Sequence, residues 1–262
     1  MHHHGEIALS GESLLLIPFV FAAAMYLAGV VLQMRRGRPW PQERTALWML
    51  GLVVAASGAL GQLGHSSFAG HMAAHLAVGM VAPLLLVLGA PVTLALRSLH
   101  IVPARRLSRL LRSIPARMLM NPVVAATLNV GGMWVFYLTP LYSLAQGAWL
   151  FHVLVMVHLL IVGFLFTAAI VTPDPSPHRS SFALRAVVLL LALAAHAVLA
   201  KYLYANPPAG VALAEAQEGA QLMFYGGDLV DLVLLALLGA QWYRVSGRRL
   251  ARASVALERR AA

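Results

Sequence analysis

The sequence predicts an all-α protein, a bundle of seven transmembrane helices, and three observations lead to this fold class. The chain has 262 residues, of which 60% are hydrophobic and only 11% charged. Seven apolar stretches follow one another, each about 20 residues long and thus able to cross ~30 Å of hydrocarbon. Positive charge occurs in every second gap between the stretches, as the positive-inside rule requires. No loop is long enough for a second domain, so we expect one membrane domain over residues 1–262.

Each of the first three spans is an apolar run with polar or charged residues at its ends. They cover residues 14–34, 45–64 and 71–96. The third carries Pro83, which removes a helix hydrogen bond and predicts a bend near its middle. The segment Gly89-Ala90-Pro91 predicts its end. In the basic loop that follows, residues 103–112 have the pattern of a short amphipathic helix that lies on the membrane surface.

The remaining four spans follow the same rule and cover residues 122–141, 149–171, 186–204 and 220–243. The fourth begins at Pro122, and proline suits the first turn of a helix. Between the fifth and the sixth, residues 173–177 (PDPSP) predict a tight turn, because proline disfavours helix in the residue before it.

The arginines fix the predicted orientation, with the N-terminus periplasmic and the C-terminus cytoplasmic. No Lys or Arg precedes the first span, and arginines then follow the first, third, fifth and seventh spans. This distribution predicts a multi-pass protein of the cell inner membrane. A net charge of +10 would suggest nucleic acid as the partner of a soluble protein. Here the charges flank spans, so we expect contact with the lipid bilayer and no nucleic acid.

The third predicted span carries His71 and His75, whose spacing places them on one face of a helix. The span runs inward, so His75 lies about 6 Å deeper than His71, at 1.5 Å of rise per residue. Met72 lies beside them. Ionisable side chains inside a membrane are costly and mark functional sites. We therefore predict that His71, His75 and Met72 bind a metal; hydrogen bonding of the histidines within the bundle is the plainer alternative.

Three further spans bring ionisable side chains to the outer half or the middle of the bilayer. His152 and His158 lie on the fifth span, about 120° apart around the helix, so they cannot both face one centre squarely. His196 lies on the sixth span, and Asp228 lies on the seventh with Asp231 on the same face. We predict that His152, His158, His196 and Asp228 contribute to the same metal site.

The ligand types suit copper, although they do not by themselves choose it over other metals. The sequence contains no cysteine, which excludes disulfides and removes thiolate from the possible ligands. Imidazole together with thioether suits copper, as Cu(I) or Cu(II), although imidazole also suits zinc, iron and nickel. The carboxylate of Asp228 has a second possible role, in orienting a histidine ligand.

Several motifs resemble one family, the multi-span CtaG-type cytochrome c oxidase assembly factors. The motifs are residues 71–76 (HMAAHL), 82–94 (APLLLVLGAPVTL), 158–166 (HLLIVGFLF) with the following Asp174-Pro175, and 219–228 (GAQLMFYGGD). His196 stands where the family often has a histidine. The chain departs from the family at Ala74, where many members have glutamine.

The resemblance implies a non-enzymatic role in building haem–copper oxidases, with copper supplied to the catalytic subunit. The partners it implies are that subunit and a periplasmic copper donor, and the sequence leaves a homo-oligomer open. The residues leave two other functions open. One is a b-type membrane cytochrome in which His75 and His158 ligate haem, and the other is a proton-coupled transporter that uses Asp228, Asp231 and Lys201.

Overall fold

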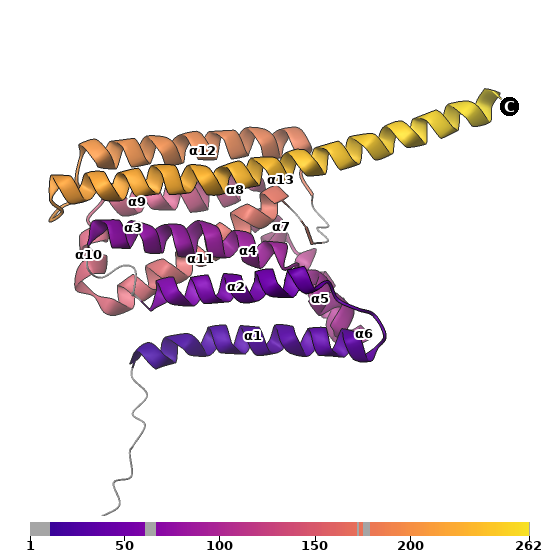
Figure 1. Ribbon diagram of the computed structural model, residues 1–262, viewed down its shortest axis with the longest axis horizontal. Coiled ribbons are helices and arrows are strands. Elements are labelled where there is room, and N and C mark those ends of the chain that lie inside the picture. The colour runs from indigo at the N-terminus through magenta and orange to yellow at the C-terminus, as the bar shows by residue number, and fades with distance from the viewer. Residues whose placement is uncertain (1–10, 61–66, 172, 175–178, 262) are drawn as a thin grey trace, which may run out of the picture.

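A computed structural model describes residues 11–60, 67–171, 173–174 and 179–261, and within these residues it is all-helical with no strand (Figure 1). The run His2–His4, His65, the end of the second predicted span and residues 175–177 of the predicted turn lie outside the described residues. The elements are α1 (Gly11–Arg35), α2 (Gln42–Ala59), α3 (Phe68–Leu76), η1 (Ala77–Val81), α4 (Ala82–Leu88), α5 (Pro91–Ser98), α6 (Ile101–Leu111), α7 (Ile114–Leu119), α8 (Pro122–Ala126), η2 (Thr127–Gly131), α9 (Gly132–Leu138), α10 (Leu141–Gly147), α11 (Trp149–Val171), α12 (Phe182–Ala205) and α13 (Leu213–Ala261).

Five helical segments within the described residues are long and apolar enough to cross a membrane: Leu14–Arg35, Phe68–Ser98, Trp149–Val171, Phe182–Ala205 and Leu213–Gly247. A sixth forms if Pro122–Leu138 and Leu141–Gly147, which meet at 77°, are taken as one broken span. The remaining predicted span, 45–64, corresponds to α2, which begins with the polar residues Gln42, Glu43 and Arg44. The seven-span count therefore stays a prediction, while a multi-span helical membrane protein is confirmed.

The long helices run side by side, with α1 and α2 at one edge of the bundle and α12 and α13 at the other (Figure 1). Helices α3, α4 and α11 lie between these edges. The described arginines all lie at the end that holds α5, α6 and α7, where the last turns of α13 extend beyond the bundle. The opposite end holds α10. The two ends thus differ in charge as the sequence predicts, and the compartment that each end faces stays a prediction.

Two π-helical turns interrupt the spans, η1 in the third and η2 in the fourth. The predicted disruption at Pro83 takes this form: η1 ends at Val81, directly before Pro83 enters the first turn of α4. Proline has no N–H to donate to the carbonyl of Gly79, four residues earlier, so a wider turn is accommodated there. Such turns occur often at functional sites.

The segment after α4 ends the helix as the sequence predicts. Ala90 adopts the left-handed conformation with φ 51° and ψ 55°, and Pro91 starts α5. The carboxylate of Asp174, from the loop after α11, stabilises this break. It accepts hydrogen bonds from the backbone N–H groups of Val92 at 3.2 Å and Thr93 at 2.8 Å, and from the Thr93 hydroxyl at 2.5 Å. Asp174 is thus a distant N-terminal cap for α5.

Replacing Asp174 with alanine is expected to lower the stability of the protein by about 2 kcal/mol, since a lost N-terminal cap costs up to that amount. The first turn of α5 would lose its acceptor and the Thr93 hydroxyl its partner. A lower thermal unfolding midpoint in detergent measures the effect. Asp174→Asn keeps one carbonyl oxygen and should lie between the two; equal midpoints for all three proteins would contradict the assignment.

The arginine-rich end contains a second polar network, which joins α11, α12 and α13. Arg185 is buried, and its guanidinium donates to the carbonyl oxygen of Ile170 at 2.7 Å and to the side-chain oxygen of Gln241 at 3.1 Å. The Gln241 amide donates to the carbonyl of Val171. These side chains satisfy carbonyl groups at the end of α11, which have no partner within the helix.

Candidate metal site

His71 lies one turn into α3, buried with 2% of its surface exposed. The Ser67 hydroxyl caps this helix by accepting from the backbone N–H of Gly70 at 3.1 Å, which fixes where the helix begins. Aromatic rings surround the imidazole. The ring centroids of Tyr142 and Phe136 lie 5.3 and 6.1 Å from that of His71. A buried imidazole needs hydrogen-bond partners for its ring nitrogens, so its neighbours in the protein matter for its chemistry.

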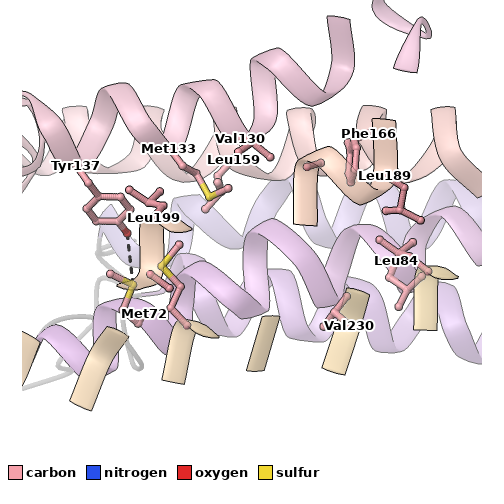
Figure 2. Packing of buried hydrophobic residues seen from close by; sticks show 14 of the residues in the cluster. Met72, Leu84, Val130, Met133, Tyr137, Leu159, Phe166, Leu189, Leu199 and Val230 are labelled. Atoms are coloured by element: carbon pink, nitrogen blue, oxygen red, sulfur yellow. Dashed lines mark hydrogen bonds between the residues drawn. The ribbon is translucent and has the colours of Figure 1, made fainter. Parts of the chain in front are cut away.

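Tyr137 of α9 is the hydrogen-bond partner of His71. The Nε2 atom of His71 lies 3.0 Å from the Tyr137 hydroxyl oxygen, and that hydroxyl donates to the sulfur of Met72 at 3.6 Å (Figure 2). A hydroxyl has one proton. When it is donated to sulfur, the oxygen accepts from His71, which then carries its proton on Nε2. In that tautomer the buried Nδ1 atom, which has no hydrogen-bond partner, presents a free lone pair, as a metal ligand must.

His75 of α3 and His196 of α12 form the second part of the site. Their rings stack with centroids 6.3 Å apart and planes 10° apart. Both side chains are buried, and the Nε2 atom of each has no hydrogen-bond partner. Gly227 of α13 makes room for this stack, because a Cβ atom there would overlap the ring of His196. Helices α3 and α12 thus bring the imidazoles of His75 and His196 together, one helical turn from His71.

Two cavities adjoin these imidazoles, and His75 lines both. The larger has a volume of about 570 Å³; its wall is mostly apolar and includes His71, Asn129, Tyr137 and His158. The smaller has a volume of about 20 Å³, room for about one water molecule. Its wall is formed by His75, Gly79, Met80, Asn129, Val130, Met133, Leu159, Phe166, Ala192, Leu193, His196 and Asp231.

The structure brings most of the sequence-predicted site residues to one region. His71, His75 and His196 are buried as described, and Met72 is fully buried beside them. The ring centroid of His152 lies 6.4 Å from that of His71. His158 lies apart from that cluster, exposed at the wall of the larger cavity.

Of the two aspartates on α13, Asp228 is exposed, whereas Asp231 is buried and lines the smaller cavity with His196. Sequence reasoning selected Asp228 and left Asp231 as a secondary candidate. Tyr137 was missed altogether. Asn129, Met133 and Tyr137 follow one another at intervals of four residues, and this spacing places them on one helix face.

No group of three or more His, Asp or Glu side chains within the described residues has the geometry of a complete metal site. What the structure offers is pairs of imidazoles, with thioethers from Met72, Met80 and Met133 near them. Soft ligands of this kind select Cu(I) over harder ions. The potential donor atoms thus come from α3, α12 and nearby thioethers rather than from a preformed cage of three histidines.

Comparison with known proteins gives a family match over most of the chain. Residues 24–245 match the family described as cytochrome c oxidase caa3 assembly factor (Caa3_CtaG). No solved structure gives a significant match.

The curated relatives are uncharacterised mycobacterial proteins. One from Mycobacterium leprae is 32% identical over 248 residues, which cover 85% of this chain and 38% of the relative. Proteins of Mycobacterium bovis and Mycobacterium tuberculosis are each 36% identical over 196 residues, which cover 71% of this chain and 30% of the relative. The chain therefore matches less than half the length of these relatives.

Proposed function

Because this chain belongs to the cytochrome c oxidase caa3 assembly factor family, we propose that it delivers copper to the catalytic subunit of a haem–copper oxidase. In this proposal copper is cargo, held within the membrane bundle and then passed on. Only ligand exchange between two membrane proteins is needed, so the protein acts as a metallochaperone and not as an enzyme. The family match supports a role in oxidase assembly; the copper, the partner and the route are the proposal.

One observation carries the copper proposal: three buried imidazoles have a ring nitrogen with no partner. They are Nδ1 of His71 and the Nε2 atoms of His75 and His196. A buried polar atom without a partner costs about 1–3 kcal/mol, and a bound metal ion would offset that cost. These imidazoles lie in a bundle whose remaining interior is mostly apolar.

The residues that would hold copper are His71, His75 and His196, with the sulfur of Met72 beside them. Imidazole binds both oxidation states, and thioether favours Cu(I). Tyr137 would orient His71 by holding its Nε2 proton, as a hydrogen-bond partner orients a metal-ligating histidine. His152 stands next to His71 as an additional ligand. Asp231 would balance the charge of the ion from the smaller cavity.

The proposal places the protein in the cell inner membrane. Positive charge gathers at the end with α5, α6 and α7, which would face the cytoplasm by the positive-inside rule. The imidazoles lie toward the α10 end, so they would occupy the periplasmic half of the bilayer. A periplasmic copper donor is the source of the metal in this proposal. A homo-oligomer is compatible with this arrangement but is not needed for it.

A bis-histidine haem is the second candidate, because His75 and His158 line the same large cavity. Haem propionates carry negative charge and require cationic partners or water. The described arginines all lie at the opposite end of the bundle. The described arginines therefore offer no partner to haem propionates beside these imidazoles, and a visible spectrum decides between haem and copper.

Protein purified in detergent and loaded with Cu(I) is expected to retain about one copper ion per chain after desalting, as imidazole and thioether sites do. Elemental analysis gives the metal content, and a reduced-minus-oxidised visible spectrum of the same sample detects haem. Loading with zinc alone is the control for non-specific imidazole binding. A protein that retains no copper, or one whose spectrum shows a sharp haem band, would contradict the proposal.

A further inference from the structure

The imidazole cluster is covered at the α10 end of the bundle by aromatic side chains. Phe68 stacks on His71 with ring centroids 6.2 Å apart, and Tyr142 of α10 meets the same imidazole edge-on at 5.3 Å. Phe68 and Tyr142 also contact each other at 5.8 Å. Among the described residues, these aromatic side chains cover the imidazoles at this end, and His71 and His75 are almost fully buried.

The larger cavity offers a different path, because it opens on the flank of the bundle. Its wall is built from α3, η2, α9, α10 and α11. Leu128, Val135 and Leu154 line it and have 36%, 54% and 57% of their surfaces exposed. Side chains exposed there face the hydrocarbon once the bundle is in a membrane. The cavity therefore connects the buried imidazoles with the lipid phase rather than with water.

His158 lies in this opening. It is an exposed residue of α11 that lines the cavity, and an ionisable side chain on a lipid-facing flank is costly unless it has a function. Gly132 packs against it: a Cβ atom at that position would come within 3.2 Å of the Nε2 atom of His158. The neighbouring Gly131 also lines the cavity, and a Cβ atom there would meet only Thr127, at 3.7 Å. Gly131 at the end of η2 and Gly132 at the start of α9 therefore keep the opening clear of side chains.

We propose that copper passes sideways through this cavity, between the buried imidazoles and a transmembrane helix of the acceptor protein that docks at the opening. His158 is the ligand that the ion meets in the opening. This inference rests on the proposed function and identifies the partner surface of the same site. A bare ion in an apolar cavity is strongly disfavoured, so transfer must proceed from ligand to ligand. The acceptor segment therefore presents an imidazole or a thioether of its own at the opening.

The membrane-embedded opening is what selects a transmembrane helix as the occupant. A soluble partner would approach the α10 end, where Phe68 and Tyr142 cover His71. An acyl chain could fill the apolar part of the cavity but offers no ligand to the metal. The family assembles cytochrome c oxidase, itself a membrane protein, which agrees with an acceptor that lies in the same bilayer.

The route is testable with two Cu(I) chelators of different solubility. Copper-loaded protein in lipid nanodiscs is mixed with neocuproine, which partitions into the membrane, or with bathocuproine disulfonate, which is charged and stays in water. Copper is expected to leave roughly tenfold faster to neocuproine, at matched concentrations, because only the lipid phase reaches the cavity. The appearance of the coloured chelate gives both rates.

Gly131→Leu should fill the opening and remove most of the advantage of neocuproine while copper content stays unchanged. Gly239→Leu is the matched control, since Gly239 of α13 has nothing within 4 Å of a Cβ atom and does not line the cavity. His158→Ala should slow transfer to neocuproine without emptying the site. Its control is His100→Ala, because His100 is an exposed histidine directly before α6. The histidine pair keeps the test valid if Gly131→Leu does not fold.

Each outcome has a definite meaning. Equal extraction rates for the two chelators, or unchanged rates in both Gly131→Leu and His158→Ala, would overturn the lateral route while leaving copper binding intact. A wild-type protein that holds no copper would overturn the proposed function and this inference with it.

Discussion

Replacing His71 and His75 together with alanine is expected to yield a folded protein that no longer retains copper. The two residues supply the α3 side of the proposed site, and each has a ring nitrogen without a hydrogen-bond partner. Removing these ring nitrogens also removes the cost of burying them without a partner. The Tyr137 hydroxyl loses His71 but keeps the sulfur of Met72 as its acceptor. Copper content after Cu(I) loading measures the effect. We expect a loss of more than about tenfold in retained metal, the size expected for lost ligands.

The matched control is His100→Ala, an exposed histidine at the arginine-rich end that should leave the copper content unchanged. His196→Ala should give a partial loss, since it removes one imidazole of the stacked pair and leaves the other. Size-exclusion chromatography and circular dichroism report whether each variant is folded. A folded double variant with the copper content of the wild type would place the site elsewhere.

The sequence predicts the imidazole cluster because helix periodicity acts over short distances. His71 and His75 share a face at a spacing of four residues, and both are buried in the structure. His152 and His158, six residues apart, cannot face one centre, and the structure places one beside His71 and the other at the wall of the larger cavity. The basic loops also separate to one end of the bundle. These features depend on local geometry and on charge, which a sequence displays directly.

The choice between Asp228 and Asp231 could not be made in this way. Both lie on one broad face of α13, and which one points inward depends on how the helix is rotated by its neighbours. Gly226 packs against Leu76 of α3, and Gly227 packs against His196 of α12. These two contacts fix the rotation, which buries Asp231 and leaves Asp228 exposed. Contacts between distant segments carry no local signal.

Tyr137 was missed for a related reason. A tyrosine in an apolar span looks like an ordinary membrane residue, and its role depends on a partner 66 residues away in the sequence. The π-helical turn η2, which contains Asn129, has no proline within it to indicate its position. Asp174 likewise acts on α5 across 81 residues. The resemblance to the family indicated which motifs matter, without showing that the Asp-Pro turn caps the segment after Gly89-Ala90-Pro91.

Gly163→Ala is expected to cause the largest loss of stability of any single methyl addition considered for this protein. Helix α11 approaches η1 so closely that a Cβ atom at Gly163 would overlap the carbonyl oxygen of Gly79 and lie 2.9 Å from the Cγ atom of Pro83. Backbone cannot rotate away as a side chain can. Overpacking of a rigid contact costs about 1–3 kcal/mol or more, so much of the protein should fail to fold or should unfold at a markedly lower temperature.

The same contact links stability to the site, since it sets the distance between α11 and the third span. Small residues at such crossings let helices approach in a membrane, where no hydrophobic force drives them together. Leu159, which packs on Gly79, also lines both cavities, so a wider crossing would move the wall beside His75. Gly239→Ala is the control: it adds the same methyl group where nothing lies within 4 Å and should be neutral or stabilising by up to about 1 kcal/mol. Equal thermal midpoints and equal yields for the two variants would mean that α11 and η1 are not in tight contact in the membrane.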